Sequence, residues 1–217
     1  MGGRLPLVRG GENVLVIVAV EGPSAAGKTT WCRAHAARFV HECVPTGAEP
    51  DGSDPAAQAD YWVSVNSGRW AEAVELERRT GQAVCDSDPL KLHYSWCLAT
   101  IGAAPWDRFQ HELQRCRTAF AAGSLGLADL VLVSTASDEQ LRRQKAADPS
   151  RRRRSFDLHV RLREPLLAWY ASLEALSPGR VLWTLPEHNA VLTAARPRAV
   201  RTDPTRLDAL VDQLPGP

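Results

Sequence analysis

The chain has 217 residues, of which 44% are hydrophobic, and its formal net charge is +1. This length suits one domain with a sizeable core, residues 1–217, and is short for two. The near-zero charge argues against a general nucleic-acid binder. No apolar run approaches the roughly 20 residues of a membrane helix, and no secretory signal opens the sequence, so we expect a cytoplasmic protein with no nucleic-acid or membrane partner.

The first 55 residues predict a strand, a glycine loop and a helix in succession. Val14 to Val20 is a continuous, β-branched apolar run, which is typical of a strand buried on both faces of a parallel sheet. After the glycine loop, a helix is expected over about 29–39. A second strand is expected over 39–44, where it runs into a loop over 42–55 that is rich in Gly, Pro and acidic residues.

The middle of the chain predicts a helix over 61–79, or two short helices broken at Gly68. A short strand follows over 83–86, and Pro89 then suits the first position of a helix. Two apolar helical faces come next; their residues are Leu90, Tyr94, Cys97 and Ile101 in the first, and Phe109, Leu113, Cys116 and Phe120 in the second.

The remaining elements follow the same alternation. Ser137 and Gln140 have the spacing of a capping box at a helix start, and Pro165 predicts a kink in a later helix. In chain order the expected elements are a strand over 130–134, a helix over 137–146, a loop with four arginines over 148–155, a helix over 156–176, a strand over 181–185 and a final helix from Pro204. Strands that alternate with helices predict a parallel sheet with helices on both faces.

The five cysteines show none of the close spacings of zinc or redox motifs, and no His/Cys/carboxylate cluster has metal-ligand spacing. We expect reduced thiols, most of them in the core. The residues are Cys32, Cys43, Cys85, Cys97 and Cys116.

The segment GPSAAGKT, from Gly22 to Thr29, fits the pattern G-x-x-x-x-G-K-[ST] in full. Its glycines let the backbone fold around an anion, and the following helix points its positive end at the same place. Lys28 would reach the terminal phosphates of a nucleotide and Thr29 would ligate magnesium. The alternative is a turn that binds nothing. The expected nucleotide-binding residues are Gly22, Pro23, Ser24, Ala25, Ala26, Gly27, Lys28, Thr29 and Thr30.

Three stretches of the chain resemble the P-loop nucleoside and nucleotide kinases, the family of thymidylate kinase and the deoxynucleoside kinases. They are VEGPSAAGKTT over 20–30, VCDSDP over 84–89, and ADLVLVS over 128–134 with LRRQK over 141–145. The resemblance implies a three-layer α/β fold with a central, mainly parallel five-stranded sheet, helices on both faces and an arginine-bearing lid. It also implies an enzyme that transfers the γ-phosphoryl group of Mg²⁺-bound ATP to a small-molecule acceptor, with a nucleoside or nucleotide favoured.

The resemblance divides the domain into residues 12–30 for the first strand and phosphate loop, 45–80 for an acceptor-side region and 141–156 for the lid. Lid cations would stabilise charge on the transferring phosphoryl group. The alternative for 151–154 is a solvated run of charge. The expected catalytic residues, lid cations included, are Lys28, Asp86, Arg142, Lys145, Arg151 and Arg153.

Asp86 ends a predicted strand, which is where ligands bind in parallel α/β sheets. We expect it to activate the acceptor hydroxyl or to hold magnesium, and Asp88 to cap a helix or to make a second magnesium contact. Glu49 is a weaker acceptor-side candidate, for which an ordinary loop acid is the favoured interpretation. The family usually places arginine directly after the acid, whereas this chain has Ser87.

Two alternatives stay open for the acceptor, and the departure at Ser87 bears on the first of them. One is the hydroxyl of another metabolite or of an antibiotic. The other is water, in a P-loop NTPase or nucleotide switch. The sequence also leaves the donor, ATP or GTP, and the oligomeric state open, a homodimer included.

Overall fold

The computed structural model describes residues 15–148 and 155–215. Its sheet is parallel throughout and has the order β2-β1-β3-β4. The strands are β1 (Val16–Glu21), β2 (Gln82–Asp86), β3 (Leu130–Val133) and β4 (Val181–Leu182). The helices are α1 (Lys28–His35), α2 (Pro55–Thr80), α3 (Leu92–Thr100), α4 (Trp106–Ala121), α5 (Asp138–Ala147), α6 (Phe156–Arg161), α7 (Arg163–Leu176), α8 (Ala190–Ala194) and α9 (Pro204–Asp212).

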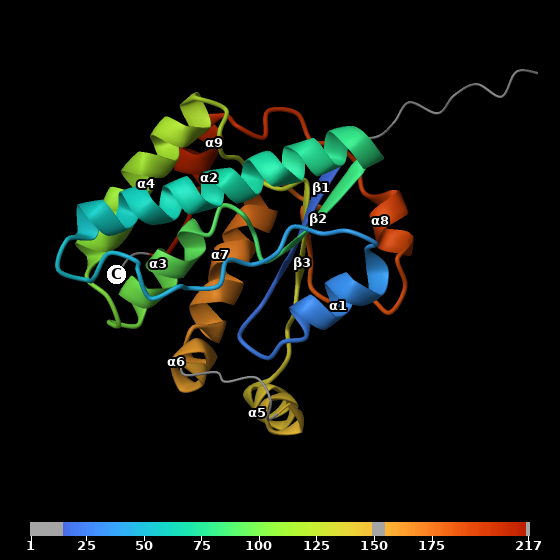
Figure 1. Ribbon diagram of the computed structural model, residues 1–217, viewed down its shortest axis with the longest axis horizontal. Helices are drawn as coiled ribbons and strands as arrows, with labels where there is room; N and C mark the ends of the chain where they lie inside the picture. The colour runs from blue at the N-terminus through green and yellow to red at the C-terminus, as the bar shows by residue number, and fades with distance from the viewer. Residues whose placement is uncertain (1–14, 149–154, 216–217) are drawn as a thin grey trace, which may run out of the picture.

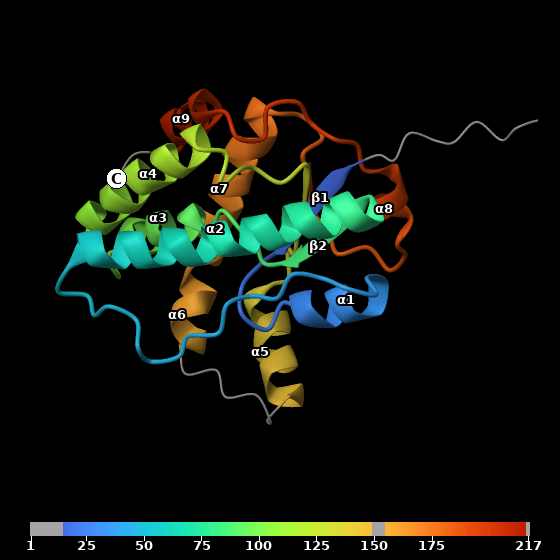
Figure 2. The same ribbon diagram turned by 45° about the horizontal axis from the view of Figure 1, so that its top comes forward.

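Both faces of β1 are buried, as its unbroken apolar run predicts. Ile17 and Ala19 face one hydrophobic cluster, while Val16, Val18 and Val20 face another. Helices α2, α3, α4, α7 and α9 supply the first cluster, and α1 and α8 supply the second. Figures 1 and 2 show these two helical layers on opposite sides of the sheet, so the predicted three-layer α/β arrangement is confirmed.

The predicted number of five strands is wrong, since the sheet has four over the residues that the structure describes. The expected strand over 39–44 is reduced to a single parallel bridge between Val40 and Cys85. The amide of Val40 donates to the carbonyl of Val84, but the next carbonyl, of His41, accepts from the guanidinium of Arg69 instead of from a strand. The side chain of Arg69 therefore ends the pairing after one residue.

Two helix predictions have different outcomes. The single helix expected over 61–79 is confirmed as part of α2, which starts earlier, at Pro55, and the alternative break at Gly68 is wrong. Helix α2 packs along α4 and β2, and such packing outweighs the roughly 1 kcal/mol cost of a helical glycine. The expected kinked helix over 156–176 is two helices that meet at Leu162, with Pro165 in the first turn of α7, where a missing amide hydrogen is tolerated.

The local signals at other helix ends have different outcomes. Ser137 and Gln140 form the predicted capping box of α5. Pro89, by contrast, lies outside α3, whose N-cap is Lys91. All five cysteines are free thiols, and four of them are buried.

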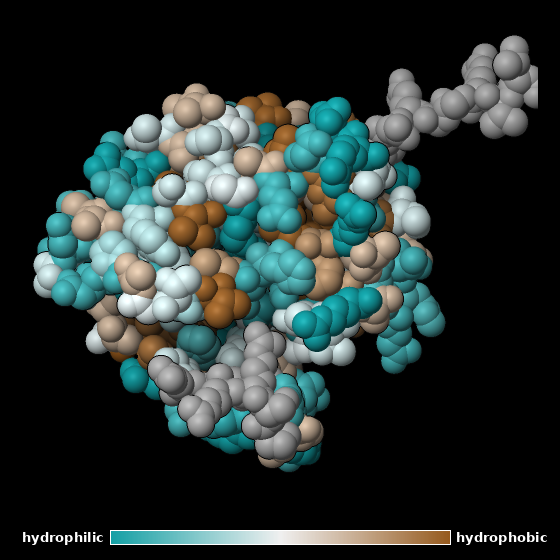
Figure 3. Space-filling view, viewed as in Figure 1, coloured by the Kyte–Doolittle hydropathy of each residue, from teal (hydrophilic) through white to brown (hydrophobic). Residues whose placement is uncertain are grey.

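The outer surface carries mixed polarity. Figure 3 shows hydrophilic residues along α2 with hydrophobic ones scattered between them. Within the described ranges, no helix combines the length and the apolar character needed to cross a bilayer.

Glu112 on α4 makes stability depend on pH. The residue is only 4% exposed, and burial raises the pKa of its carboxyl to about 7 from 4.5, although Ser95 and Arg108 oppose the shift. At a pH between these two pKa values, the Glu112 carboxyl is deprotonated in the unfolded chain and protonated in the folded chain. The free energy of unfolding therefore falls as the pH rises from about 4.5 to about 7, and stays lower above that.

We expect Glu112→Gln, which stays neutral, to stabilise the protein at pH 8 and to have little effect at pH 4.5. A shift from 4.5 to about 7 corresponds to at most about 3 kcal/mol, or several degrees in Tm. Calorimetry at the two pH values measures this. The exposed Glu72→Gln is the control. Equal shifts of Tm for Glu112→Gln at both pH values would show that its charge is not the cause.

Candidate active site

The site lies where the parallel strands end. Val20 pairs with Asp86, and Glu21 pairs with Val133, so the carboxyl ends of β1, β2 and β3 meet at one edge of the sheet. The phosphate-loop motif follows β1 directly, and the predicted acid Asp86 ends β2. The structure thus brings together the two motifs that are 57 residues apart in the chain.

The loop from Gly22 to Gly27 has the backbone that the motif predicts. Gly22, with φ of 150°, passes so close to β3 that an added Cβ would lie 2.9 Å from the Cβ of Ser134. Gly27 is left-handed, with φ of 85°. Helix α1 begins at Lys28, so its free amide groups face the loop.

Lys28 and Thr29 point back toward the strand ends. The ammonium of Lys28 donates to the carbonyl of Gly22 at 2.8 Å. The hydroxyl of Thr29 donates to Oδ2 of Asp86 at 2.6 Å. Thr30, by contrast, is exposed on α1. The Thr29 hydroxyl therefore reaches the carboxylate of the neighbouring strand, while the Lys28 ammonium binds the backbone of its own loop.

Asp86 has the features of a ligand for a hard cation. It is only 3% exposed, and its Oδ1 has no hydrogen-bond partner among the described residues. Buried polar atoms are rarely left unpartnered, and Mg²⁺ prefers oxygen ligands such as this carboxylate and the adjacent Thr29 hydroxyl. The described ranges contain no group of three or more His, Cys, Asp or Glu side chains that could hold a metal. Magnesium in phosphate-loop sites uses few protein ligands, so the pair fits such an ion.

Asp88 differs from Asp86 because both its oxygens are occupied. Oδ1 accepts from the amide of Leu90 at 3.0 Å, and Oδ2 accepts from the hydroxyl of Tyr170 at 3.1 Å. Burial raises the pKa of this carboxyl. The first contact is the capping role that the sequence offered as an alternative, although the capped amide belongs to the turn before α3.

Glu21 is the residue that the sequence interpretation missed. It is 1% exposed, and its carboxylate accepts from the amides of Gly22 at 2.9 Å and Asp88 at 3.0 Å. Burial alone would raise its pKa, but the charges of Lys91, His93 and Lys28 outweigh this effect and hold the pKa well below its ordinary value. An acid that ends a fully apolar strand is the sequence signal that could have identified it.

A buried polar network extends from Glu21 into the helical layer. His93 Nε2 lies 3.4 Å from Oε2 of Glu21, and His93 Nδ1 lies 3.4 Å from the hydroxyl of Tyr170. The same hydroxyl bonds Asp88. Burial lowers the pKa of His93 to about 4, despite the opposing charge of Glu21, so the imidazole is neutral at pH 7. The network joins β1, α3 and α7 behind the phosphate loop.

Arg69 of α2 holds the backbone at the end of β2 and in the loop that follows it. Its buried guanidinium donates to the carbonyls of Asp86 and Ser87, both at 2.8 Å. Because the Arg69 guanidinium bonds these backbone carbonyls, it fixes the conformation of the backbone after Asp86.

The predicted lid residues lie only partly within the described ranges. Arg142 is exposed on α5, and Lys145 Nζ lies 4.2 Å from the centre of the Phe156 ring. Arg151 and Arg153 fall outside the described residues. Helices α5 and α6 lie beside the phosphate loop (Figures 1 and 2). They pack on it through a hydrophobic cluster, which we call the lid cluster; its members are Ala26, Leu141, Phe156 and Val160.

Glu49, the weaker acceptor-side candidate, behaves as a loop acid. It is half-buried and accepts hydrogen bonds from the amides of Thr46 and Gly47. These bonds lower the pKa of its carboxyl, that from Thr46 most. Its role is to shape the turn in which it lies.

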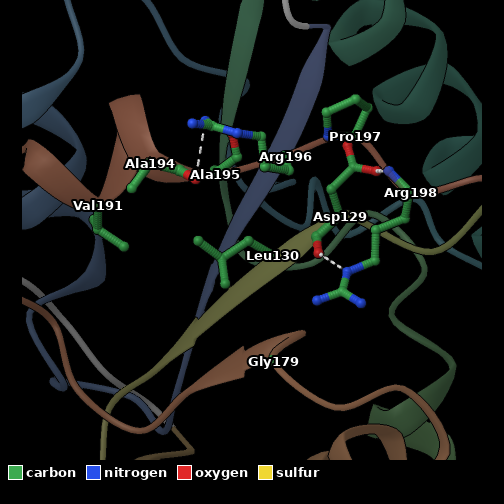
Figure 4. A pocket seen from close by; sticks show the side chains of 9 residues that line it. All are labelled: Asp129, Leu130, Gly179, Val191, Ala194, Ala195, Arg196, Pro197 and Arg198. Atoms are coloured by element: carbon green, nitrogen blue, oxygen red, sulfur yellow. Dashed lines mark hydrogen bonds between the residues drawn. The ribbon is translucent and has the colours of Figure 1, made fainter.

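Two cavities differ in their relation to this site. One of about 250 Å³ adjoins the phosphate loop; its lining residues are Ala26, Ser134, Thr135, Ala136, Gln140, Gln144, Thr184 and Leu185. Another of about 430 Å³ lies at the opposite edge of the sheet, beside the start of β3 (Figure 4); its lining residues are Asp129, Leu130, Gly179, Val191, Ala194, Ala195, Arg196, Pro197 and Arg198. There the guanidiniums of Arg196 and Arg198 are bound to backbone carbonyls. The motif residues favour the first cavity as the functional one, although it is the smaller.

Comparison with known proteins places the fold. No family model and no curated protein matches the chain. Deoxyadenosine kinase from M. mycoides with dCMP and dCDP bound is similar in structure, with a TM-score of 0.57 and 12% identity over 82% of this chain and 97% of that chain. The same enzyme with bound dATP gives a TM-score of 0.53 and 11% identity over the same shares.

NadR protein in complex with NR is also similar, with a TM-score of 0.53 and 17% identity over 91% of this chain and 51% of that chain. At these identities the likeness shows the fold. The chain has the fold of the P-loop nucleoside and nucleotide kinases, which confirms the resemblance drawn from its sequence.

Proposed function

We propose that the chain is a phosphotransferase that moves the γ-phosphoryl group of Mg²⁺-bound ATP to a small-molecule acceptor, a nucleoside or nucleotide first of all. The observation that carries the proposal is the 2.6 Å contact between Thr29 of the phosphate loop and Asp86 at the end of β2. It joins a phosphate cradle to an acid whose second oxygen lacks a partner among the described residues. Cradle, hydroxyl and acid are the parts that phosphoryl transfer requires.

In this proposal the loop amides from Gly22 to Thr29 and the ammonium of Lys28 bind the phosphates. Thr29 and Asp86 hold magnesium, which neutralises charge on the phosphate oxygens when bound. We do not extend the metal role to Asp88, because both its oxygens already accept hydrogen bonds. We assign Asp88 to shaping the loop after β2.

The donor base would occupy the cavity beside the loop. Its walls carry the amide side chains of Gln140 and Gln144 and the apolar side chain of Leu185, which suit the hydrogen-bonding edge and the flat face of a base. Arg142 and Lys145 of α5, with Arg151 and Arg153, remain the proposed lid cations. They would act mainly on charge that develops during transfer.

An acceptor screen tests the function. Release of ADP from Mg²⁺-ATP is measured without acceptor and with nucleosides, nucleoside monophosphates and other alcohols, and products are examined by mass spectrometry. We expect one nucleoside or nucleotide to raise ADP release far above the background with water and to gain one phosphoryl group. Parallel assays with GTP identify the donor.

The alternatives make different forecasts in the same screen. A kinase of another metabolite or of an antibiotic would respond only to other alcohols. A nucleotide switch or ATPase would release ADP or GDP at a rate independent of every acceptor. Failure to bind either triphosphate would contradict the proposal as a whole.

A further inference from the structure

Lys91 is one of three lysines in the chain, and the function proposed above gives it no role. Its side chain is 24% exposed and reaches into the site from the start of α3. The ammonium donates to Oε1 of Glu42 at 3.0 Å and to the hydroxyl of Ser87. It also lies 3.7 Å from Oε2 of Glu21.

The position of Glu21 places Lys91 next to the phosphate site. The ammonium of Lys28 lies 4.0 Å from Oε1 of Glu21, and that of Lys91 lies 3.7 Å from Oε2. Two ammonium groups thus flank the two oxygens of one buried carboxylate. Lys28 is the group that the loop motif directs to the terminal phosphates. The ammonium of Lys91 lies by the other oxygen of the same carboxylate, and so borders the place to which the motif directs Lys28.

The backbone holds Lys91 in this place. Ser87 and Lys91 have φ of 75° and 53°, a left-handed conformation that residues other than glycine seldom adopt. Arg69 binds the carbonyl of Ser87, and Glu21 accepts from its hydroxyl at 3.1 Å. Strained conformations persist where surrounding contacts fix them, and they gather at functional sites. Here the contacts direct the Lys91 side chain toward the phosphate loop.

Glu42 is the partner of Lys91 that an incoming phosphate can replace. Its side chain is 32% exposed, whereas that of Glu21 is 2% exposed. Burial would raise the pKa of Glu42, but Lys91 and Lys28 lower it to about 2, so the carboxylate is charged at neutral pH. Only its Oε1 is bonded by a described residue. A carboxylate at the solvent side is the contact that an incoming phosphate can replace at least cost.

We propose that Lys91 binds the terminal phosphoryl group of the donor nucleotide, opposite Lys28, and that Glu42 holds its ammonium until the nucleotide arrives. The inference rests on the proposed function and adds to it a second phosphate-binding cation, which is supplied by α3 rather than by the phosphate loop or the lid. Glu21 is then a positioning residue, since it lies between the two ammonium groups.

Calorimetric titration with Mg²⁺-ADP and with the Mg²⁺ complex of a non-hydrolysable ATP analogue tests this without knowledge of the acceptor. We expect Lys91→Met to bind the diphosphate as the wild type does and to lose about ten-fold or more in affinity for the triphosphate. We expect Glu42→Gln to gain affinity for the triphosphate only, because Lys91 has lost its charged competitor. An ion pair with a purely structural role would change affinity for both nucleotides alike.

The titrations of the wild type and the variants distinguish failure of the proposed function from failure of the role given to Lys91. If the wild type binds neither nucleotide, the proposed function fails and this inference fails with it. If the wild type binds both and Lys91→Met keeps the wild-type preference for the triphosphate, only the role of Lys91 is overturned. Thermal unfolding checks that Lys91→Met is folded. Should it be unfolded, Glu42→Gln decides alone, and an unchanged preference for the triphosphate there would refute the role of Lys91.

Discussion

Lys28→Ala should abolish the stabilisation of the protein by Mg²⁺-ATP. A ligand at 100 times its Kd stabilises the folded state by about 2.7 kcal/mol, which for a chain of this length raises Tm by roughly 5–10 °C. The Lys28 ammonium already bonds the carbonyl of Gly22 at the mouth of the loop, from where it would meet the terminal phosphates. Differential scanning calorimetry with and without the nucleotide measures the rise.

The matched control is Arg78→Ala. Arg78 is an exposed cation near the end of α2, which leads into the opposite edge of the sheet, and it pairs only with Glu75 among the described residues. This variant should keep the full rise in Tm. A wild-type Tm that Mg²⁺-ATP leaves unaltered at millimolar concentration would sink the phosphate-loop assignment itself.

Asp86→Asn should lower turnover by about 10² to 10⁴ while the fold persists. The substitution keeps the shape of the side chain and an oxygen for the Thr29 hydroxyl, but it removes the charge that a magnesium ion or an acceptor proton requires. Assistance by a positioned base is worth about this factor, and loss of a charge that stabilises the transition state is of similar size. Steady-state kinetics with the acceptor found in the screen measures it.

Asp88→Asn is the matched comparison, because Asp88 lies two residues after Asp86 and both side chains are buried. An asparagine oxygen can still accept from the amide of Leu90, and its amino group can donate to Tyr170, so turnover should fall much less. If Asp88→Asn proves the more damaged variant, or if Asp86→Asn turns over at a near-normal rate, the roles given to these two acids must be exchanged or withdrawn.

The parts of the site that could be predicted are those that depend on residues close together in the sequence. The phosphate loop depends on residues within eight positions, and the strand before it is a single apolar run. Asp86 followed from the rule that ligands gather at strand ends. Each of these inferences needs no knowledge of which distant segments meet.

The parts that were missed depend on tertiary contacts. Glu21, His93 and Tyr170 come from three elements, and no spacing along the chain shows that their polar groups meet. The lost fifth strand has a similar cause, since the Arg69 guanidinium takes the His41 carbonyl that would have continued the ladder. A side chain 28 positions away in the chain thereby overrides a local strand signal.

The lid cluster is packed separately from the two cores on the faces of the sheet, so the two regions can change in sequence independently. Its four residues are distinct from the cores on either face of the sheet, and substitutions that share no partners tend to have additive effects on stability. The surfaces of α5 and α6 can therefore diverge without repacking of the sheet. Ala25 and Ala26 have less freedom, because they serve the phosphate loop and support these helices at once. Divergence of α5 and α6 is thus constrained where they attach to the phosphate loop and open at their outer face.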